Sequence, residues 1–428
     1  MPQRVVVVAC CALLLACSSE TERDAETDAE TPTERETDGE PASEAVGYAR
    51  DVEPILRAQC TGCHRVDGNA PFALDGYERA APNAHAIASA TRARRMPPWP
   101  PQTNDECPPL IGARGLSERE IALLEAWAAA GAPKGEPAKP ARDRPVRAQP
   151  LDELASIDAR LQASEPYVPR PRVDDHRCFP VDPQLTADRY LTAYAVREDV
   201  PGIVHHVQLW ALDDPTLDAQ LDALDAADPG PGYACPAGHA LPARYVSVWA
   251  PSEPVRRHPE GTGVLLGAGR RMVIQIHYHD RLGLELPDHT AIELELAEQV
   301  AKPASLWTVS NGEILLPPGQ AHSTVRALAP VPSDAPVQLW GVRPHMHSLG
   351  SSARIDAREG SDAQCLLAVP RWDPAWQLMY FFASPIELSP STLLEVECNY
   401  DTRTQTEPVR YGIGTGDEMC FGFFYVTE

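Results

Sequence analysis

Two kinds of residue cluster in this chain could carry redox chemistry: a cysteine pair beside a histidine, and closely spaced histidines further along. Cys60, Cys63 and His64 have the C-x-x-C-H spacing. Two thiols at this spacing attach the vinyl groups of a haem covalently, and the adjacent imidazole binds the iron. We therefore predict one covalent haem c here. A redox dithiol or half of a zinc site is the alternative, although the sequence has no second C-x-x-C to complete a zinc site.

The histidines form three pairs in segments with the alternating pattern of strands: His205 and His206, His277 and His279, and His345 and His347. Residues two apart in a strand project from the same face, so a His-x-His pair can hold one metal ion. The adjacent pair could share a metal only at a strand end or bulge. We interpret the other histidines as lone surface or core residues: His176, His239, His258, His289 and His322. Imidazoles alone would suit zinc, whereas a thioether ligand favours copper.

The order of these motifs, followed by Met419 in an Asp-Glu-Met-Cys run, resembles the ascorbate-dependent type II copper monooxygenases. This is the family of dopamine β-monooxygenase and peptidylglycine α-hydroxylating monooxygenase, and the resemblance covers about residues 166–428. It implies two copper ions. The electron-storing copper would be bound by His205, His206 and His277, and the oxygen-reacting copper by the catalytic residues His345, His347 and Met419. The resemblance implies that His279 is a neighbour of the electron-storing copper and not a ligand. The spacing of His277 and His279 alone would also allow His279 to be a ligand.

The resemblance also implies disulfides and bears on the substrate. Cys178 would pair with Cys235, and Cys398 with Cys420. Cys107 and Cys365 are left over, either as free thiols or as a bridge between the haem domain and the catalytic unit. Arg343 matches an arginine of the peptidylglycine enzymes and is a candidate substrate contact. Phe421 and Phe423 stand where those enzymes have an asparagine and a tyrosine, which makes a peptide carboxylate substrate doubtful and the pocket more apolar.

Residues 46–135 are similar to a class I cytochrome c. A short helix over 51–59 leads to Cys60, and Ser117 and Glu120 form a capping box that opens a terminal amphipathic helix. Such a domain brings a distal methionine from the intervening loop, and Met96 is the methionine in that interval. The alternatives for the sixth ligand are His85 or an open position.

The N-terminal segments and one linker delimit the predicted domains. Residues 1–17 read as a signal segment whose end resembles a bacterial lipobox, so Cys17 would be acylated. Residues 18–45 form an acidic tether, and 136–165 a proline-rich linker. We expect a lipid-anchored protein of the cell envelope, at the outer membrane on its periplasmic or surface side. The formal net charge of −24 argues against nucleic acid as a partner.

The predicted fold is therefore multidomain: a small all-α cytochrome c domain followed by two all-β, jelly-roll-like sandwiches at 166–300 and 301–428. The predicted function is a copper monooxygenase that hydroxylates a C–H bond of a small substrate with dioxygen. The fused haem would relay single electrons from ascorbate or a periplasmic redox protein to the copper bound by His205, His206 and His277. The alternative is a non-catalytic haem and copper protein of the periplasm that carries electrons or binds copper.

Overall fold

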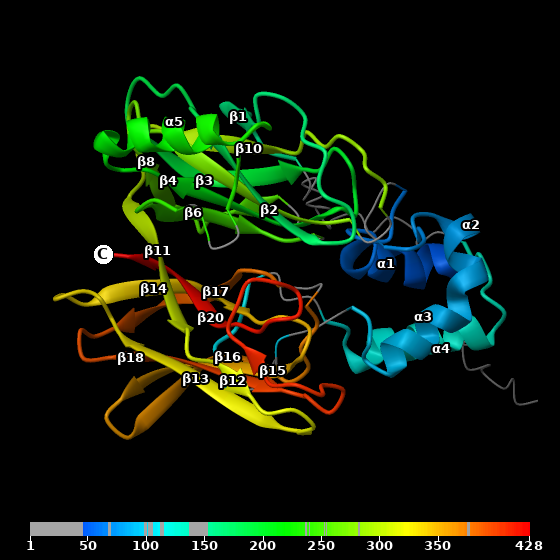
Figure 1. Ribbon diagram of the computed structural model, residues 1–428. Coiled ribbons are helices and arrows are strands. Elements are labelled where there is room, and N and C mark those ends of the chain that lie inside the picture. The colour runs from blue at the N-terminus through cyan, green and yellow to red at the C-terminus, as the bar shows by residue number, and fades with distance from the viewer. Residues whose placement is uncertain are drawn as a thin grey trace, which may run out of the picture. The chain divides into compact units, whose positions relative to one another are not determined.

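The computed structural model describes most of the chain from residue 46 onward (Figure 1). The described residues are 46–66, 70–97, 101, 106–111, 115–136, 153–235, 238, 240–251, 253, 255–280, 283–374 and 377–428. The predicted signal segment with Cys17, the acidic tether and residues 137–152 of the predicted linker lie outside them. Among the described residues, none of the helices is long and apolar enough to cross a membrane.

The first described segment is helical. A π-helical turn, η1 (Tyr48–Val52), continues into α1 (Glu53–Gln59), which delivers Cys60 at its C-terminal end. The helix α4 (Glu118–Ala129) has the predicted capping box, because the Ser117 side chain accepts from the Glu120 amide and Glu120 reaches back to the Ser117 amide. The remaining helices of this segment are α2 (Tyr77–Ala80), η2 (Ala81–Asn83) and α3 (Ala84–Arg92). Their apolar faces bury one small core that includes Leu56, Leu124 and Trp127.

The rest of the described chain is mostly β-sheet, as predicted, in four sheets. The largest has nine strands: β1 (Ala159–Gln162), β10 (Ala291–Ala297), β3 (Arg189–Arg197), β8 (Thr262–Leu266), β11 (Lys302–Asn311), β20 (Cys420–Thr427), β14 (Val337–His345) and β17 (Tyr380–Leu388), with β7 (Arg256–Arg257) paired to β3. The second has β5 (Tyr233–Ala234), β2 (Asp174–Val181), β9 (Met272–His279), β4 (Val204–Ala211) and β6 (Arg244–Trp249). The others are β13 (Ser323–Pro330), β18 (Leu393–Tyr400), β15 (Gly350–Glu359) and β16 (Asp362–Val369), and the pair β12 (Leu315–Leu316) and β19 (Val409–Arg410).

The nine-stranded sheet is continuous across the two predicted sandwiches. It is joined where β8 pairs in parallel with β11, through Thr262 opposite Lys302 and the two following residues of each strand (Figure 1). The predicted boundary between the two sandwiches, at residues 300 and 301, therefore lies next to strands of a sheet that both sandwiches share. One apolar core lies between the N-terminal half of this sheet and the five-stranded sheet, and the other between its C-terminal half and the four-stranded sheet. The shared sheet fixes the N-terminal histidine strands relative to the C-terminal ones.

Two elements differ from the sequence analysis. The strand β1 lies within the predicted linker, because its residues complete the edge of the large sheet by antiparallel pairing with β10. A helical insertion, η3 (Pro215–Leu217) and α5 (Asp218–Ala227), lies within a region predicted to be all strand. Leu221 buries its side chain in the apolar cluster around the Cys178–Cys235 disulfide, and Leu217 and Leu224 of the insertion pack against the same cluster.

Candidate metal centre

The N-terminal histidines come from three neighbouring strands of the five-stranded sheet. β9 pairs with β2 on one side and with β4 on the other, so that His277 lies opposite both His176 and His206. The pairing of β4 with β9 shifts register between Val204 and His206. Such a bulge adds one residue to a strand and redirects its side chains. This explains how the adjacent pair His205 and His206 can serve one site.

The imidazole rings of these strands lie within contact distance of one another. The ring centroid of His277 is 4.8 Å from that of His205 and 4.9 Å from that of His206, and the two neighbours are 5.7 Å apart. Burial lowers the pKa of His206 well below its usual value, and burial also lowers the pKa of His277 to about 2. Buried imidazoles that stay neutral keep a lone pair for a metal ion.

A carboxylate orients two of these rings. Asp174 Oδ1 accepts from His277 Nε2 and from His279 Nδ1, each at 2.9 Å. Burial would raise the pKa of Asp174, but the hydrogen bonds from Thr415, His279 and His277 outweigh it and hold this pKa well below the usual value. The other nitrogen of His277, Nδ1, is buried and has no hydrogen-bond partner among the described residues. A carboxylate on one nitrogen and a free lone pair on the other is the usual surrounding of a metal-binding histidine.

The C-terminal pair lies at the end of β14. His345 is the last residue of that strand, Met346 packs into the core with no exposed surface, and His347 returns to the side of His345. The two rings are 5.2 Å apart. His345 Nδ1 contacts Gln377 Oε1, and His347 Nδ1 donates to the Asp417 carbonyl at 2.9 Å. Both Nδ1 atoms are engaged, so each ring can offer Nε2 to a metal ion.

Met419 precedes β20 and is held in place through its neighbours. The Tyr400 hydroxyl donates to the Met419 carbonyl at 2.8 Å, and Cys420 forms a disulfide with Cys398. The buried carboxylate of Glu418 accepts from the His347 amide at 2.9 Å and from the Leu349 amide. The loop that carries Met419 is therefore bound to the residues that carry His347.

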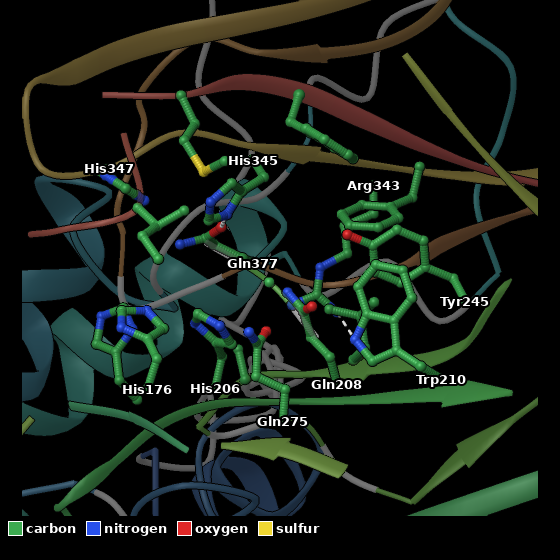
Figure 2. A pocket seen from close by; sticks show the side chains of 18 of the residues that line it. His176, His206, Gln208, Trp210, Tyr245, Gln275, Arg343, His345, His347 and Gln377 are labelled. Carbon is green, nitrogen blue, oxygen red and sulfur yellow. Dashed lines mark hydrogen bonds between the residues drawn. The ribbon is translucent and has the colours of Figure 1, made fainter. Parts of the chain in front are cut away.

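Side chains from both sets line one cavity of about 420 Å³. His176, His205 and His206 line it from the N-terminal strands, and His345, His347 and Met419 from the C-terminal ones. Figure 2 shows His176 and His206 on one side, with His345 and His347 facing them. Neutral imidazoles on both sides, a thioether on one, and buried nitrogens with free lone pairs form a donor set that suits copper.

Residues 304–427 match the family model of the copper type II ascorbate-dependent monooxygenases, C-terminal domain. The peptidyl-glycine alpha-amidating monooxygenase of Mus musculus is 22% identical over 282 residues, which are 64% of this chain and 27% of the mouse protein. The chain is therefore similar to these copper monooxygenases, and residues 304–427 carry the match to the family model.

Two further relatives agree. The dopamine beta-hydroxylase of Canis lupus familiaris is 22% identical over 42% of this chain and 31% of its own length. The MOXD1 homolog 1 of Drosophila melanogaster is 23% identical over 42% of this chain and 28% of its own length. This chain therefore spans less than a third of the length of these copper monooxygenase relatives. Among solved structures, the major capsid protein P2 of bacteriophage PM2 aligns over 63% of this chain and 97% of its own, with 8% identity and a TM-score of 0.28, which is too low to indicate a relationship.

The disulfides of the described residues include both pairs that the family resemblance implies, Cys178–Cys235 and Cys398–Cys420. A third, Cys107–Cys365, joins the segment after α3 to β16, which is the bridging alternative for the two remaining cysteines. It connects the haem-motif part of the chain covalently to the C-terminal sandwich.

Arg343 lines the cavity and is already engaged by protein groups. Its Nη1 donates to the Val248 carbonyl at 2.6 Å and lies 3.3 Å from Glu253 Oε2. Both charged side chains are almost fully buried, at 3% and 0% exposure. Glu253 also pairs with Arg256, at 2.5 Å, so it is shared between two arginines. These contacts hold the Arg343 side chain in place and occupy its Nη1 group.

The haem motif retains the groups that covalent haem attachment requires. Neither Cys60 nor Cys63 forms a disulfide, and both are half-buried. His64 is buried, and its Nδ1 donates to the Phe72 carbonyl at 2.9 Å, which leaves Nε2 for iron. Met96 lies in the loop after α3 and is 39% exposed. These residues fit a c-type haem bound through His64, and they leave the choice of a sixth ligand open.

The interpretation of His176 as a lone histidine was wrong. Its ring stacks on that of His277 with centroids 3.9 Å apart, inside the metal centre. The sequence signal for it was absent, because no second histidine lies within two positions on β2. By contrast His258 and His289 bind the backbone carbonyls of Leu191 and Ala163, while His239 lies outside the described residues. Asp174 was also missed, since an acidic residue at the start of a strand carries no distinguishing pattern.

Proposed function

We propose that this chain is a copper-dependent monooxygenase that hydroxylates a C–H bond of a small substrate with dioxygen. The observation that carries the proposal is the pair of neutral imidazole sets, one with a thioether, that face one cavity. Copper in these two sites would supply single-electron storage and the activation of dioxygen. Family similarity adds support, since residues 304–427 match the family's C-terminal domain.

The protein's own residues have three tasks in this scheme. His205, His206 and His277 would bind one copper, and His345, His347 and Met419 the other. Asp174, Gln377 and the Asp417 carbonyl fix ring orientations, so that little reorganisation is needed when a metal ion binds or changes charge. The aromatic side chains on one side of the cavity form an apolar surface for the substrate.

We propose an uncharged, largely apolar or aromatic substrate. An aromatic wall lines the cavity: the Trp210 and Tyr245 ring centroids are 3.5 Å apart, and Phe423 contacts Tyr245 edge-on at 5.1 Å. Phe421 extends this wall, with its ring centroid 4.8 Å from that of Phe423. The one arginine that lines the cavity among the described residues is paired with buried Glu253. A substrate carboxylate would compete with Glu253 for Arg343, whereas an aromatic ring would find stacking partners in this wall.

The haem motif belongs to the same proposal as a one-electron relay. The segment that carries it is tied to the C-terminal sandwich by the Cys107–Cys365 disulfide and by a hydrogen bond from the Ile111 amide to the Phe381 carbonyl. Cys63 packs against the apolar core of that sandwich. A tethered carrier has a high effective concentration at its acceptor, which favours rapid transfer of single electrons. Acylation at Cys17 and location in the cell envelope complete the proposal.

The test is metal content together with oxygen consumption. The purified, export-matured chain should contain two copper ions and one covalent haem, and should consume dioxygen when a reductant and neutral aromatic candidates are added. A Cys60→Ser, Cys63→Ser variant should lose the haem but keep both copper ions. A single copper site with no oxygen consumption would leave the non-catalytic haem and copper protein as the function. Zinc in place of copper would overturn the monooxygenase proposal.

A further inference from the structure

His176 lies where a further ligand of the N-terminal metal site would be. It is on β2, directly opposite His277 of β9 in the strand register. The two rings are nearly parallel, at 14°, and His176 also faces His206 with centroids 6.2 Å apart. His176 is only 6% exposed and lines the 420 Å³ cavity between the two histidine sets.

The free nitrogen of His176 lacks a partner. Among the described residues, its Nε2 is buried and makes no hydrogen bond, as is the case for His277 Nδ1. Leaving such a group unsatisfied costs roughly 1–3 kcal/mol, so native proteins rarely do so without a reason. Two unsatisfied imidazole nitrogens on adjacent strands have a common explanation in a cation bound at the edges of the two rings.

The ligand atoms are close enough to converge. One nitrogen from each of His176, His206 and His277 lies within 4.8 Å of the others. Two nitrogens bound to one metal ion at about 2 Å lie roughly 3–4 Å apart. Rotation of the His176 ring out of its stacked position would bring its lone pair toward the ion that His206 and His277 bind. The ring centroid of His205 lies 4.8 Å from that of His277, beside the same group.

We infer that His176 is a fourth imidazole ligand of the copper held by His205, His206 and His277. This inference rests on the proposed function, because it assumes that copper occupies the site. Four nitrogen donors suit the tetragonal geometry that Cu(II) prefers. The fourth ligand would thus stabilise the oxidised ion and make the reduced ion a better electron donor.

The experiment isolates this site and counts its ligands. In a full-length background with His345→Ala and His347→Ala, Cu(II) is added and the imidazole nitrogens are counted by X-ray absorption and electron paramagnetic resonance. His176→Phe keeps a ring to stack on His277 but removes the ligand atom. His279→Phe is the matched comparison, since His279 also lies beside His277 and binds Asp174. The dissociation constant of Cu(II) is measured by chelator competition for each protein.

We expect four imidazoles in the background protein and in His279→Phe, and three in His176→Phe, with Cu(II) bound at least tenfold more weakly. Three imidazoles in the background protein, or an unchanged spectrum and affinity in His176→Phe, would overturn the inference while leaving the copper site intact. Four imidazoles that fall to three in His279→Phe would also overturn it. If His176→Phe fails to fold, the counts in the background protein and in His279→Phe still decide. A background protein that binds no Cu(II) would overturn the proposed function and this inference with it.

Discussion

Asp174 and Thr415 are hydrogen-bonded twice, although 241 positions separate them in the chain. The Thr415 amide and hydroxyl donate to Asp174 Oδ2 at 2.7 and 2.9 Å, while Oδ1 accepts from His277 and His279. Thr415 lies in the loop that leads to Met419. One carboxylate therefore connects the strand of the N-terminal histidine site to the loop of the C-terminal one.

The first prediction concerns this connection. Asp174→Asn keeps the shape but replaces a charged acceptor with an amide, so it cannot accept all four of these hydrogen bonds. We expect copper binding at the His277 site to weaken roughly 10–100-fold, as is typical when a partner of a metal-binding histidine is lost. Chelator competition measures this effect. Asp362→Asn, at an exposed position on β16, is the control and should bind copper normally. Equal affinities in the two variants would mean that Asp174 does not position His277.

The second prediction concerns the thioether. Met419→Leu conserves volume and apolarity, so the free energy of unfolding should change by less than about 1.5 kcal/mol. It removes the sulfur, and we expect the copper content to fall from two ions to one under reducing conditions, with loss of oxygen consumption. Met379→Leu, another methionine that contacts an apolar core, is the matched control and should retain both ions. Two tightly bound Cu(I) ions in Met419→Leu would show that the thioether is not a ligand.

The third prediction is a pH dependence of stability that comes from His258. Burial lowers the pKa of this histidine from 6.5 to about 4, and its Nδ1 donates to the Leu191 carbonyl. Between pH 6.5 and about 4, His258 is protonated in the unfolded chain but stays neutral in the folded chain. The free energy of unfolding therefore falls as the pH is lowered through this range. The total loss is about 3 kcal/mol, and above pH 6.5 this histidine has no effect.

Denaturant unfolding at several pH values tests the His258 prediction against His258→Gln, which does not titrate. The variant should show a shallower loss of stability between pH 6.5 and 4. Parallel curves for the two proteins would assign the acid sensitivity to other groups.

The fourth prediction concerns the Cys107–Cys365 disulfide, which closes a loop with a sequence separation of 258 residues. A crosslink over so long a loop restricts the unfolded chain strongly, and its loss typically costs 2–5 kcal/mol. We expect Cys107→Ser, Cys365→Ser to lower the unfolding midpoint and to let the helical segment unfold in a separate, earlier transition. Calorimetry checks both effects. A single transition at the original midpoint would show that noncovalent contacts alone hold the helical segment.

Much of the fold could be predicted because it follows from local patterns. The alternation of apolar residues around His206 and His277 predicts strands, and Ser117 and Glu120 predict the start of α4, because backbone geometry and capping depend on neighbours in the sequence. The insertion that contains Leu221 and the strand at Ala159 could not be predicted in this way. Each is stabilised by contacts with a distant strand rather than by its own pattern.

The sequence by itself determined the chemistry that is available: a haem-attachment motif at Cys60, histidine pairs two apart or adjacent, and a methionine beside a cysteine near the C-terminus. Each of these motifs spans only a few residues, so the spacing of near neighbours in the sequence is enough to recognise it. Only the tertiary structure decided which side chains share a site. It placed His176 and Asp174 against His277, paired Cys107 with Cys365, and brought Arg343 next to Glu253. Strand register and burial bring together residues whose separation in the chain leaves no local pattern.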